Sequence, residues 1–369
     1  MMRARAFLLS VVAVAAPGVL RGQAATTVAR TGATFESYSF GTGLAFSRIS
    51  ELTIPITFTQ RMGDRFVLDV GTAFVSASVR TVSNNKTIDH SGLVDTDLRA
   101  TVALVPGKLV FNLLGTIPTG ATTVPDTTIP LFGATATDLL GFTTPSFGSG
   151  GGMSAGFASA FKLGSDWAIG AGASYRYGAS YRPVSTSTDE LTPGGEVRAR
   201  FGIEGPFGGG KYFRGALVFT TTAANDITGG DQSTIGKRVL VYAATSLPLG
   251  SSHLSIYGWD MRRFRARPGT FPVPRGNVVA LGARLERSLS PKMTLAPLLE
   301  FRHELTGPAQ NMQLLGLLVR TGTDVRYRLS DRATGVVQAQ FAFGSIRNDS
   351  GDNVSVTGPR VGAIIEWSR

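Results

Sequence analysis

Residues 196–204 read EVRARFGIE. Every second position in this stretch is apolar: Val197, Ala199, Phe201 and Ile203. Successive side chains of a β-strand point to opposite faces of the sheet, so this strand has one apolar face and one charged face. A strand that separates lipid from a wet interior has this pattern. The stretch therefore favours a transmembrane β-barrel, although a soluble β-sandwich also alternates.

The same alternation recurs along the chain in segments of roughly ten residues, joined by connections that are short and long in turn. The short connections are rich in turn-forming residues: 61–65, 106–108, 164–166, 205–210, 249–251, 290–292 and 330–332. The long connections are 80–91, 119–150, 179–194, 223–235, 264–276, 305–312 and 346–353. This regular order of turns and loops is typical of membrane-spanning barrels.

The composition excludes several other classes of protein. The chain has 369 residues, of which 43% are hydrophobic and 17% are charged, with 46 glycines, no cysteine and a net charge of +11. A disordered chain carries less apolar material, and a disulfide-stabilised scaffold needs cysteines. The only long apolar run lies at the N-terminus, so membrane-spanning helices are not expected.

The N-terminus has the features of a secretory signal peptide. Arg3 and Arg5 precede an apolar run over residues 6–20, and Gly22 and Ala24 provide the small residues that precede cleavage. A membrane anchor is the alternative, but the run is short for a span. We expect a cleaved signal over residues 1–24 and one barrel domain over residues 25–369.

A count of strands predicts the size of the barrel. The seven short connections join fourteen strands between about residues 52 and 343, and a further strand covers residues 354–367. Both chain ends close on the turn side only if one more strand precedes residue 52, and residues 31–47 are the candidate. We predict an all-β, antiparallel transmembrane barrel of about sixteen strands, which leaves an aqueous channel. The alternative is fourteen strands with residues 31–47 as an N-terminal plug.

Aromatic residues gather next to the short connections, as at the interfacial girdle of a membrane barrel. They are Phe58, Phe66, Trp167, Tyr212, Phe213, Tyr327 and Trp367. Ordinary core packing is the alternative reading, because strands favour aromatic residues in any setting.

The end of the chain resembles bacterial outer-membrane β-barrels. Their last strand carries an assembly signal of glycine, two variable residues, an apolar residue, a variable residue and an aromatic residue, and residues 362–367, GAIIEW, match it. The resemblance implies that the protein lies in the bacterial outer membrane. It also implies contact with outer-membrane lipid and lipopolysaccharide, and recognition by the barrel-assembly machinery.

In the porins of this class the longest loop follows the fifth strand and folds inward, and residues 119–150 follow the fifth predicted strand. The resemblance implies a constriction formed by this loop. Its candidate residues are Asp126, Leu131, Phe132, Asp138, Leu139, Leu140 and Phe142. The apolar content is similar to that of long-chain fatty-acid transporter-type barrels, which admit apolar substrates. Alternatively, these side chains pack the loop against the inner wall.

The charged faces of the strands predict a wet lumen, because an unpaired ion in a dry core costs several kcal/mol or more. The candidate channel-lining residues are Asp69, Asp95, Asp97, Arg99, Arg198, Arg200, Arg214, Arg284, Glu286, Glu300, Arg302, Asp324, Arg326 and Arg328. Acidic early strands that face basic later strands would filter solutes by charge. Ion pairs that stiffen the wall are the alternative.

None of the remaining motifs indicates a catalytic site. Arg262, Arg263, Arg265 and Arg267 form a cluster that suits lipopolysaccharide phosphates or anionic solutes, and no nucleic-acid role is expected of an exported protein. The histidines, His90, His253 and His303, are scattered without metal or nucleophile spacing. We expect no enzyme activity, no metal and no cofactor.

The sequence thus predicts an outer-membrane channel for passive diffusion of small solutes. A transporter of hydrophobic compounds and a non-conducting structural or adhesive barrel are the alternatives. The solute, the openness of the pore and the formation of a homo-oligomer stay open.

Overall fold

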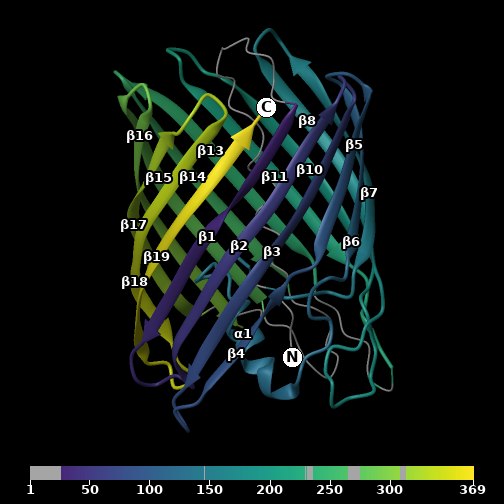
Figure 1. Ribbon diagram of the computed structural model, residues 1–369, viewed down its shortest axis with the longest axis vertical. Coiled ribbons are helices and arrows are strands. Elements are labelled where there is room, and N and C mark those ends of the chain that lie inside the picture. Colours follow the sequence, from purple (N-terminus) through teal and green to yellow (C-terminus); the bar gives the residue numbers. More distant parts are fainter. Residues whose placement is uncertain (1–25, 145, 229, 231–235, 265–274, 308–312) are drawn as a thin grey trace.

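The computed structural model describes residues 26–144, 146–228, 230, 236–264, 275–307 and 313–369. The predicted signal peptide, residues 1–24, lies outside the described residues, as do Arg265 and Arg267. The described chain forms a closed antiparallel β-barrel, confirming the predicted fold class (Figure 1). No helix among the described residues is long and apolar enough to cross a membrane.

The barrel wall has sixteen strand positions, one of which is shared by β4 and β5. In chain order the wall consists of β1 (Thr27–Phe40), β2 (Phe46–Met62), β3 (Phe66–Thr81), β4 (Thr87–Leu93), β5 (Thr96–Val105), β6 (Leu109–Ile117), β7 (Gly152–Leu163), β8 (Trp167–Gly178), β10 (Glu196–Pro206), β11 (Tyr212–Thr222), β13 (Arg238–Leu249), β14 (Ser252–Arg263), β15 (Arg275–Ser290), β16 (Met293–Gly307), β17 (Gln313–Arg328), β18 (Ala333–Arg347) and β19 (Asn353–Ser368). The loops add a short pair, β9 (Leu191–Thr192) with β12 (Asp226–Ile227), and the consecutive turns η1 (Asp126–Thr128) and α1 (Ile129–Thr135).

The barrel closes where the first strand meets the last. β1 pairs with β19 from Val28 opposite Ser368 to Phe40 opposite Val356, so the 362–367 motif lies in the closing strand. The fourteen-strand alternative is wrong, because residues 27–40 form part of the wall rather than a plug. The predicted first strand, 31–47, was misplaced: it begins at Thr27 and ends at Phe40. The chain turns over residues 41–45, where Gly43 has a φ of +115°, a conformation that glycine adopts without strain.

All seven predicted short connections are turns between neighbouring strands. The prediction of a long loop over residues 80–91 was wrong, because residues 87–93 form β4, which pairs with β3. A tight turn with Asn85 at a φ of 54° replaces the loop. β3 pairs with β4 at one end and with β5 at the other, and the strand that these two form is interrupted at Val94 and Asp95.

The outer face of the barrel is apolar. Large side chains at alternate positions are exposed, including Ile56, Phe157, Leu281 and Val337. Six of the seven predicted girdle residues share this outward parity, and the rings of Trp167 and Phe213 lie 6.3 Å apart. Tyr212 does not belong to the girdle, because it has the inward parity of Arg214.

Candidate functional site

The loop over residues 119–150 folds into the barrel and packs on one part of the inner wall. Its Leu131, Leu139, Leu140 and Phe147 are almost completely buried. They belong to a core cluster with inward side chains of β1–β3 and of β17–β19: Tyr38, Phe40, Ile49, Ala73, Val75, Ala77, Val79, Leu318, Ala342, Val354 and Val356. The apolar side chains of the loop therefore act as an anchor, the second of the two readings of the sequence.

Ring contacts reinforce this packing. The ring of Phe142 lies edge-on to that of Tyr38, with centroids 5.2 Å apart. His90 of β4 lies 5.6 Å from Phe132 and 5.1 Å from Phe147, ring to ring, so this histidine serves the loop contact. Aromatic pairs in such geometry add about 0.5–1.5 kcal/mol beyond the area that they bury.

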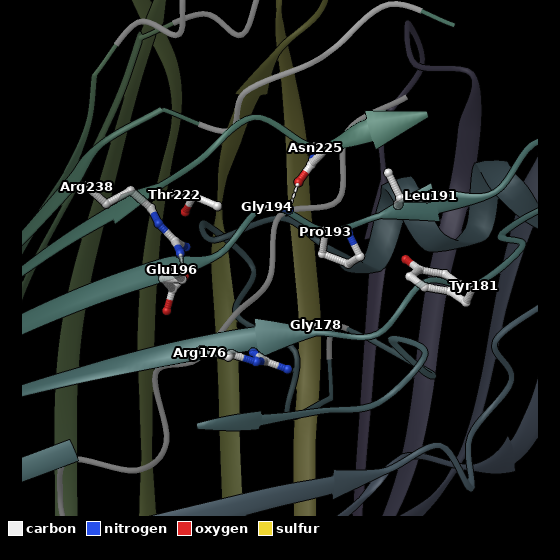
Figure 2. A pocket seen from close by; sticks show the side chains of 10 residues that line it. All are labelled: Arg176, Gly178, Tyr181, Leu191, Pro193, Gly194, Glu196, Thr222, Asn225 and Arg238. Carbon is white, nitrogen blue, oxygen red and sulfur yellow. Dashed lines mark hydrogen bonds and ion pairs between the residues drawn. The ribbon is translucent and has the colours of Figure 1, made fainter. Parts of the chain in front are cut away.

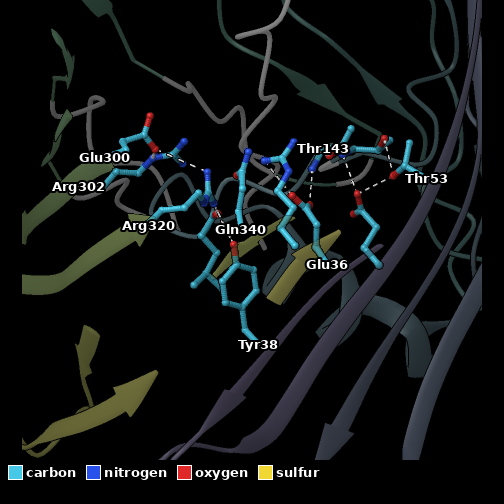
Figure 3. A network of polar contacts seen from close by, with 12 residues as sticks. Glu36, Tyr38, Thr53, Thr143, Glu300, Arg302, Arg320 and Gln340 are labelled. Carbon is cyan, nitrogen blue, oxygen red and sulfur yellow. Dashed lines mark hydrogen bonds and ion pairs between the residues drawn. The ribbon is translucent and has the colours of Figure 1, made fainter. Parts of the chain in front are cut away.

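Two buried glutamates hold the loop backbone (Figure 3). Glu36 accepts a hydrogen bond of 2.9 Å from the backbone N–H of Thr143 and forms an ion pair of 2.9 Å with Arg360. Glu51 accepts 2.8 Å hydrogen bonds from the backbone N–H of Thr144 and from the hydroxyl of Thr53. Each glutamate is only 1% exposed, so these donors replace part of the water that its carboxylate loses; Glu51 receives both of its hydrogen bonds on Oε1.

A second set of polar contacts comes from β16 and β17 (Figure 3). Arg320 donates hydrogen bonds of 2.9 Å to the hydroxyl of Tyr38 and to the carbonyl of Leu140. Its guanidinium also lies 3.6 Å from Glu300, which pairs with Arg302 at 2.8 Å. One network thus joins β1, β16, β17 and the loop.

Asp138 fastens the far end of the loop. Its carboxylate lies 3.1 Å from the guanidinium of Arg263, which is also 3.1 Å from Glu304. Burial raises the pKa of Asp138 above its ordinary value, and the positive charge of Arg263 works against that rise. The other predicted loop carboxylate, Asp126, is exposed, and its one hydrogen bond among the described residues is from the neighbouring N–H of Thr127.

Asp95 secures the neck, where the two ends of the loop run side by side. Its carboxylate accepts hydrogen bonds from the N–H and the hydroxyl of Ser149, each 2.7 Å, and from the N–H of Gly120 at 3.2 Å. A side chain at Gly120 would overlap the carbonyl of Phe147, so the neck is closely packed. Asp95, a predicted channel-lining residue, therefore binds the neck of the loop.

Most of the other predicted lining residues have partners on the inner wall. The ion pairs are Arg198–Glu196 at 2.7 Å, Arg214–Glu204 at 2.9 Å, Arg284–Asp324 at 2.9 Å and Arg284–Glu286 at 3.4 Å. The hydroxyl of Thr59 donates to Asp69, that of Thr116 donates to Asp97, and Arg328 donates to the carbonyl of Pro291 in a short turn. Arg326 is exposed near the short turns. The acidic residues of the early strands are thus bonded locally, within the wall or to the loop.

The part of the wall that the loop leaves uncovered borders a cavity of about 360 Å³, which we call the lumen cavity. Its floor on β7 and β8 consists of small residues: Ser154, Gly156, Ala158, Gly170, Gly172 and Ser174. Its charged lining is Arg99, Arg176, Glu196, Arg198 and Arg200. Small residues on two adjacent strands leave room that larger side chains would fill.

A smaller cavity of about 40 Å³ lies between the loops that follow β8 and β11 (Figure 2). Tyr181, Pro193 and Asn225 line it, and Asn225 accepts a 2.9 Å hydrogen bond from the N–H of Gly194. Arg176 and Glu196 line both cavities, so the two adjoin at the long-loop end of the barrel.

No family model matches the sequence, and no curated protein matches it at a significant level. Solved structures do match, and the similarity is one of fold. The described chain is a closed antiparallel β-barrel, and solved bacterial outer-membrane proteins are similar to it. It is similar to OmpT, an outer membrane protein of Vibrio cholerae, with a TM-score of 0.43 and 10% identity over 94% of this chain and 99% of that chain. It is also similar to the outer membrane channel DcaP of Acinetobacter baumannii, with a TM-score of 0.43 and 11% identity over 95% of this chain and 99% of that chain. For the CymD monoaromatic hydrocarbon channel the TM-score is 0.44 and the identity is 10%, over 94% of this chain and 89% of that chain.

The predicted arginine cluster divides between two faces of the barrel. Arg263 points inward to Asp138 and Glu304, whereas the neighbouring Arg262 is exposed and has the opposite parity. Among the described residues, no group of three or more histidine, cysteine, aspartate or glutamate side chains is placed to hold a metal ion.

Sequence reasoning missed the polar residues that hold the loop: Glu36, Glu51, Arg320 and Arg360. Strand parity contained a signal for each, because all four have the inward parity of their strands. Glu36 was obscured because the first strand was misplaced.

Proposed function

We propose that the protein is a channel of the bacterial outer membrane through which small polar solutes diffuse passively. The observation that supports this proposal is the lumen cavity, which is lined by charged residues and lies beside the region that the loop fills. Arg200 is exposed although it points inward, so its guanidinium is in contact with solvent inside the barrel. The proposal assigns the chain no catalytic activity.

The two alternatives have less support. A transporter of hydrophobic compounds needs an apolar pocket, but Leu131 and Leu139 of the loop are 0% and 1% exposed and are used in packing. A purely structural barrel is expected to fill its interior with paired charges, yet the floor of the lumen cavity consists of glycine, alanine and serine.

The outer surface fits the expected lipid partners. Its exposed apolar side chains suit contact with lipid tails, and Arg262 at the long-loop end is available to lipopolysaccharide phosphates. We further propose that residues 362–367 of the closing strand are recognised by the barrel-assembly machinery.

The test is the conductance of the refolded chain, residues 25–369, in a planar bilayer. We expect stable ohmic steps from the wild type and much smaller steps from Ala158→Phe, because Ala158 lines the lumen cavity. The matched control is Ala155→Phe on the same strand, where the new ring faces outward. A correctly folded wild type without current, or equal steps from both variants, would contradict the proposal.

A further inference from the structure

The lumen cavity carries an excess of positive charge. Its lining has four arginines, Arg99, Arg176, Arg198 and Arg200, against the single carboxylate of Glu196. That carboxylate is shared: it lies 2.7 Å from Arg198 and 3.3 Å from Arg238 of β13. One glutamate between two guanidinium groups leaves the cavity basic.

Two of these arginines have no acidic partner. Within the described part of the chain, neither Arg99 nor Arg200 forms a salt bridge, although each has inward parity and lines the cavity. Arg99 lies opposite Asp69 in the β3–β5 register. The carboxylate of Asp69 instead accepts a 2.6 Å hydrogen bond from Thr59 on the other neighbouring strand. Among the residues that the structure describes, Arg99 therefore forms no salt bridge with a carboxylate.

The next carboxylate along β5 is also engaged. Asp97 accepts a 2.7 Å hydrogen bond from the hydroxyl of Thr116 on β6, and it is not among the residues that line the cavity. The elements that border the cavity thus present guanidinium groups toward it and keep their carboxylates in local contacts. On β15, by contrast, the inward Arg284 is paired with Asp324 at 2.9 Å.

We infer that the lumen cavity binds small solutes that carry a carboxylate or a phosphate, and that Arg99 and Arg200 are the groups that hold the oxyanion. A guanidinium presents a planar fork of N–H donors that fits either kind of oxyanion. Gly156, Gly170 and Gly172 on the floor leave the space that the solute needs. This inference rests on the proposed function and narrows its solutes to anions.

The site predicts a saturable effect of anions on current. In the chain of residues 25–369, inorganic phosphate and succinate, each added to a chloride solution, are expected to reduce the chloride conductance up to a plateau. In the double variant Arg99→Gln/Arg200→Gln the half-blocking concentration should rise at least tenfold, which corresponds to ~1.4 kcal/mol of binding free energy. Block by phosphate alone or by succinate alone supports the site and identifies which oxyanion it accepts.

The matched control is Arg65→Gln/Arg332→Gln. It removes the same charge from two exposed turn residues outside the cavity, and its half-blocking concentration should equal that of the wild type. An open pore that neither anion blocks, or an equal half-blocking concentration in both double variants, would overturn the inference while the proposed channel stands.

Calorimetric titration of the detergent-folded barrel with the same two anions separates the two proposals. Binding that the Arg99→Gln/Arg200→Gln variant loses supports the anion site even if the wild type carries no current, in which case only the channel proposal fails. If neither anion bound to the wild type, the proposed anion site would be refuted.

Discussion

Replacement of Asp95 by alanine should release the loop of residues 119–150 from the barrel wall without unfolding the barrel. The carboxylate makes two hydrogen bonds of 2.7 Å and one of 3.2 Å to the loop neck, and β5 itself begins only at Thr96. A hydrogen bond to a charged group contributes about 1.5–3 kcal/mol. Because Asp95 is only partly buried, we expect the loss of all three to cost about 3 kcal/mol of docking free energy.

That cost sets the size of the effect. Each 1.4 kcal/mol changes an equilibrium by about tenfold, so the population of the released loop should rise by roughly a hundredfold. Cleavage of a transiently opened segment follows this population when reclosing is fast. Chymotrypsin, which cuts after residues such as Phe132 and Phe142, should therefore cleave the loop of the folded variant roughly a hundred times faster than that of the wild type.

Asp126→Ala is the matched control, because it removes a loop carboxylate whose one hydrogen bond among the described residues is from the adjacent Thr127. It should leave the cleavage rate within about threefold of the wild type, since an exposed hydrogen bond contributes little. If Asp95→Ala raised the rate no more than this control, the neck contacts would not hold the loop, and the reasoning from hydrogen-bond geometry would be refuted.

Three further predictions concern the loop and the wall. Arg320→Met should increase loop cleavage by about tenfold rather than a hundredfold, because Glu300 keeps its 2.8 Å contact with Arg302 and is not left without a partner; an unchanged rate would contradict this. Gly358→Val should prevent closure of the barrel, since any side chain there would overlap a backbone carbonyl of β1, and a native circular dichroism spectrum after refolding would disprove it. Relative to Asp138→Asn, the wild type should lose loop docking as the pH rises, because the pKa of Asp138 is raised in the docked loop and protons therefore bind the docked form more tightly. The Asp138→Asn variant, measured in parallel at each pH, should lack this dependence, and identical pH profiles would refute it.

The sequence contained enough information for the fold because one local rule governs most strands. Alternation over residues 196–204, repeated between turns, decided the class and the count of sixteen strands, since side-chain parity needs no knowledge of distant contacts. The errors fell where local signals conflict. The turn over residues 41–45 follows an aromatic-rich segment, and β4 is a short strand that a polar turn separates from β3.

The site was less predictable, because its contacts join residues that are far apart in the chain. Parity placed Arg200 and Arg302 on the inner face correctly, but it does not say which inward charges meet. Arg320 and Tyr38 are 282 residues apart and touch only because the barrel closes and the loop enters it. Which arginines of the lumen cavity have an acidic partner among the described residues, as Arg198 does and Arg99 and Arg200 do not, depends on register and could not be read from parity.

The pattern of side chains on one early strand does indicate where the loop packs. In a membrane barrel the outward side chains are apolar, but near the long-loop end of β3 the relation is reversed: Val75 and Val79 point inward and are at most 1% exposed, while Ser76 and Ser78 point outward. Apolar side chains that line a wet lumen would lose the free energy of burial, roughly 25 cal/mol per Å². A wall with this reversed pattern must therefore be covered from inside, and among the described residues the loop that carries Leu131 covers it. The inner wall of β7 and β8 has glycines and serines instead of large apolar side chains, so it does not need to be covered, and the cavity lies there.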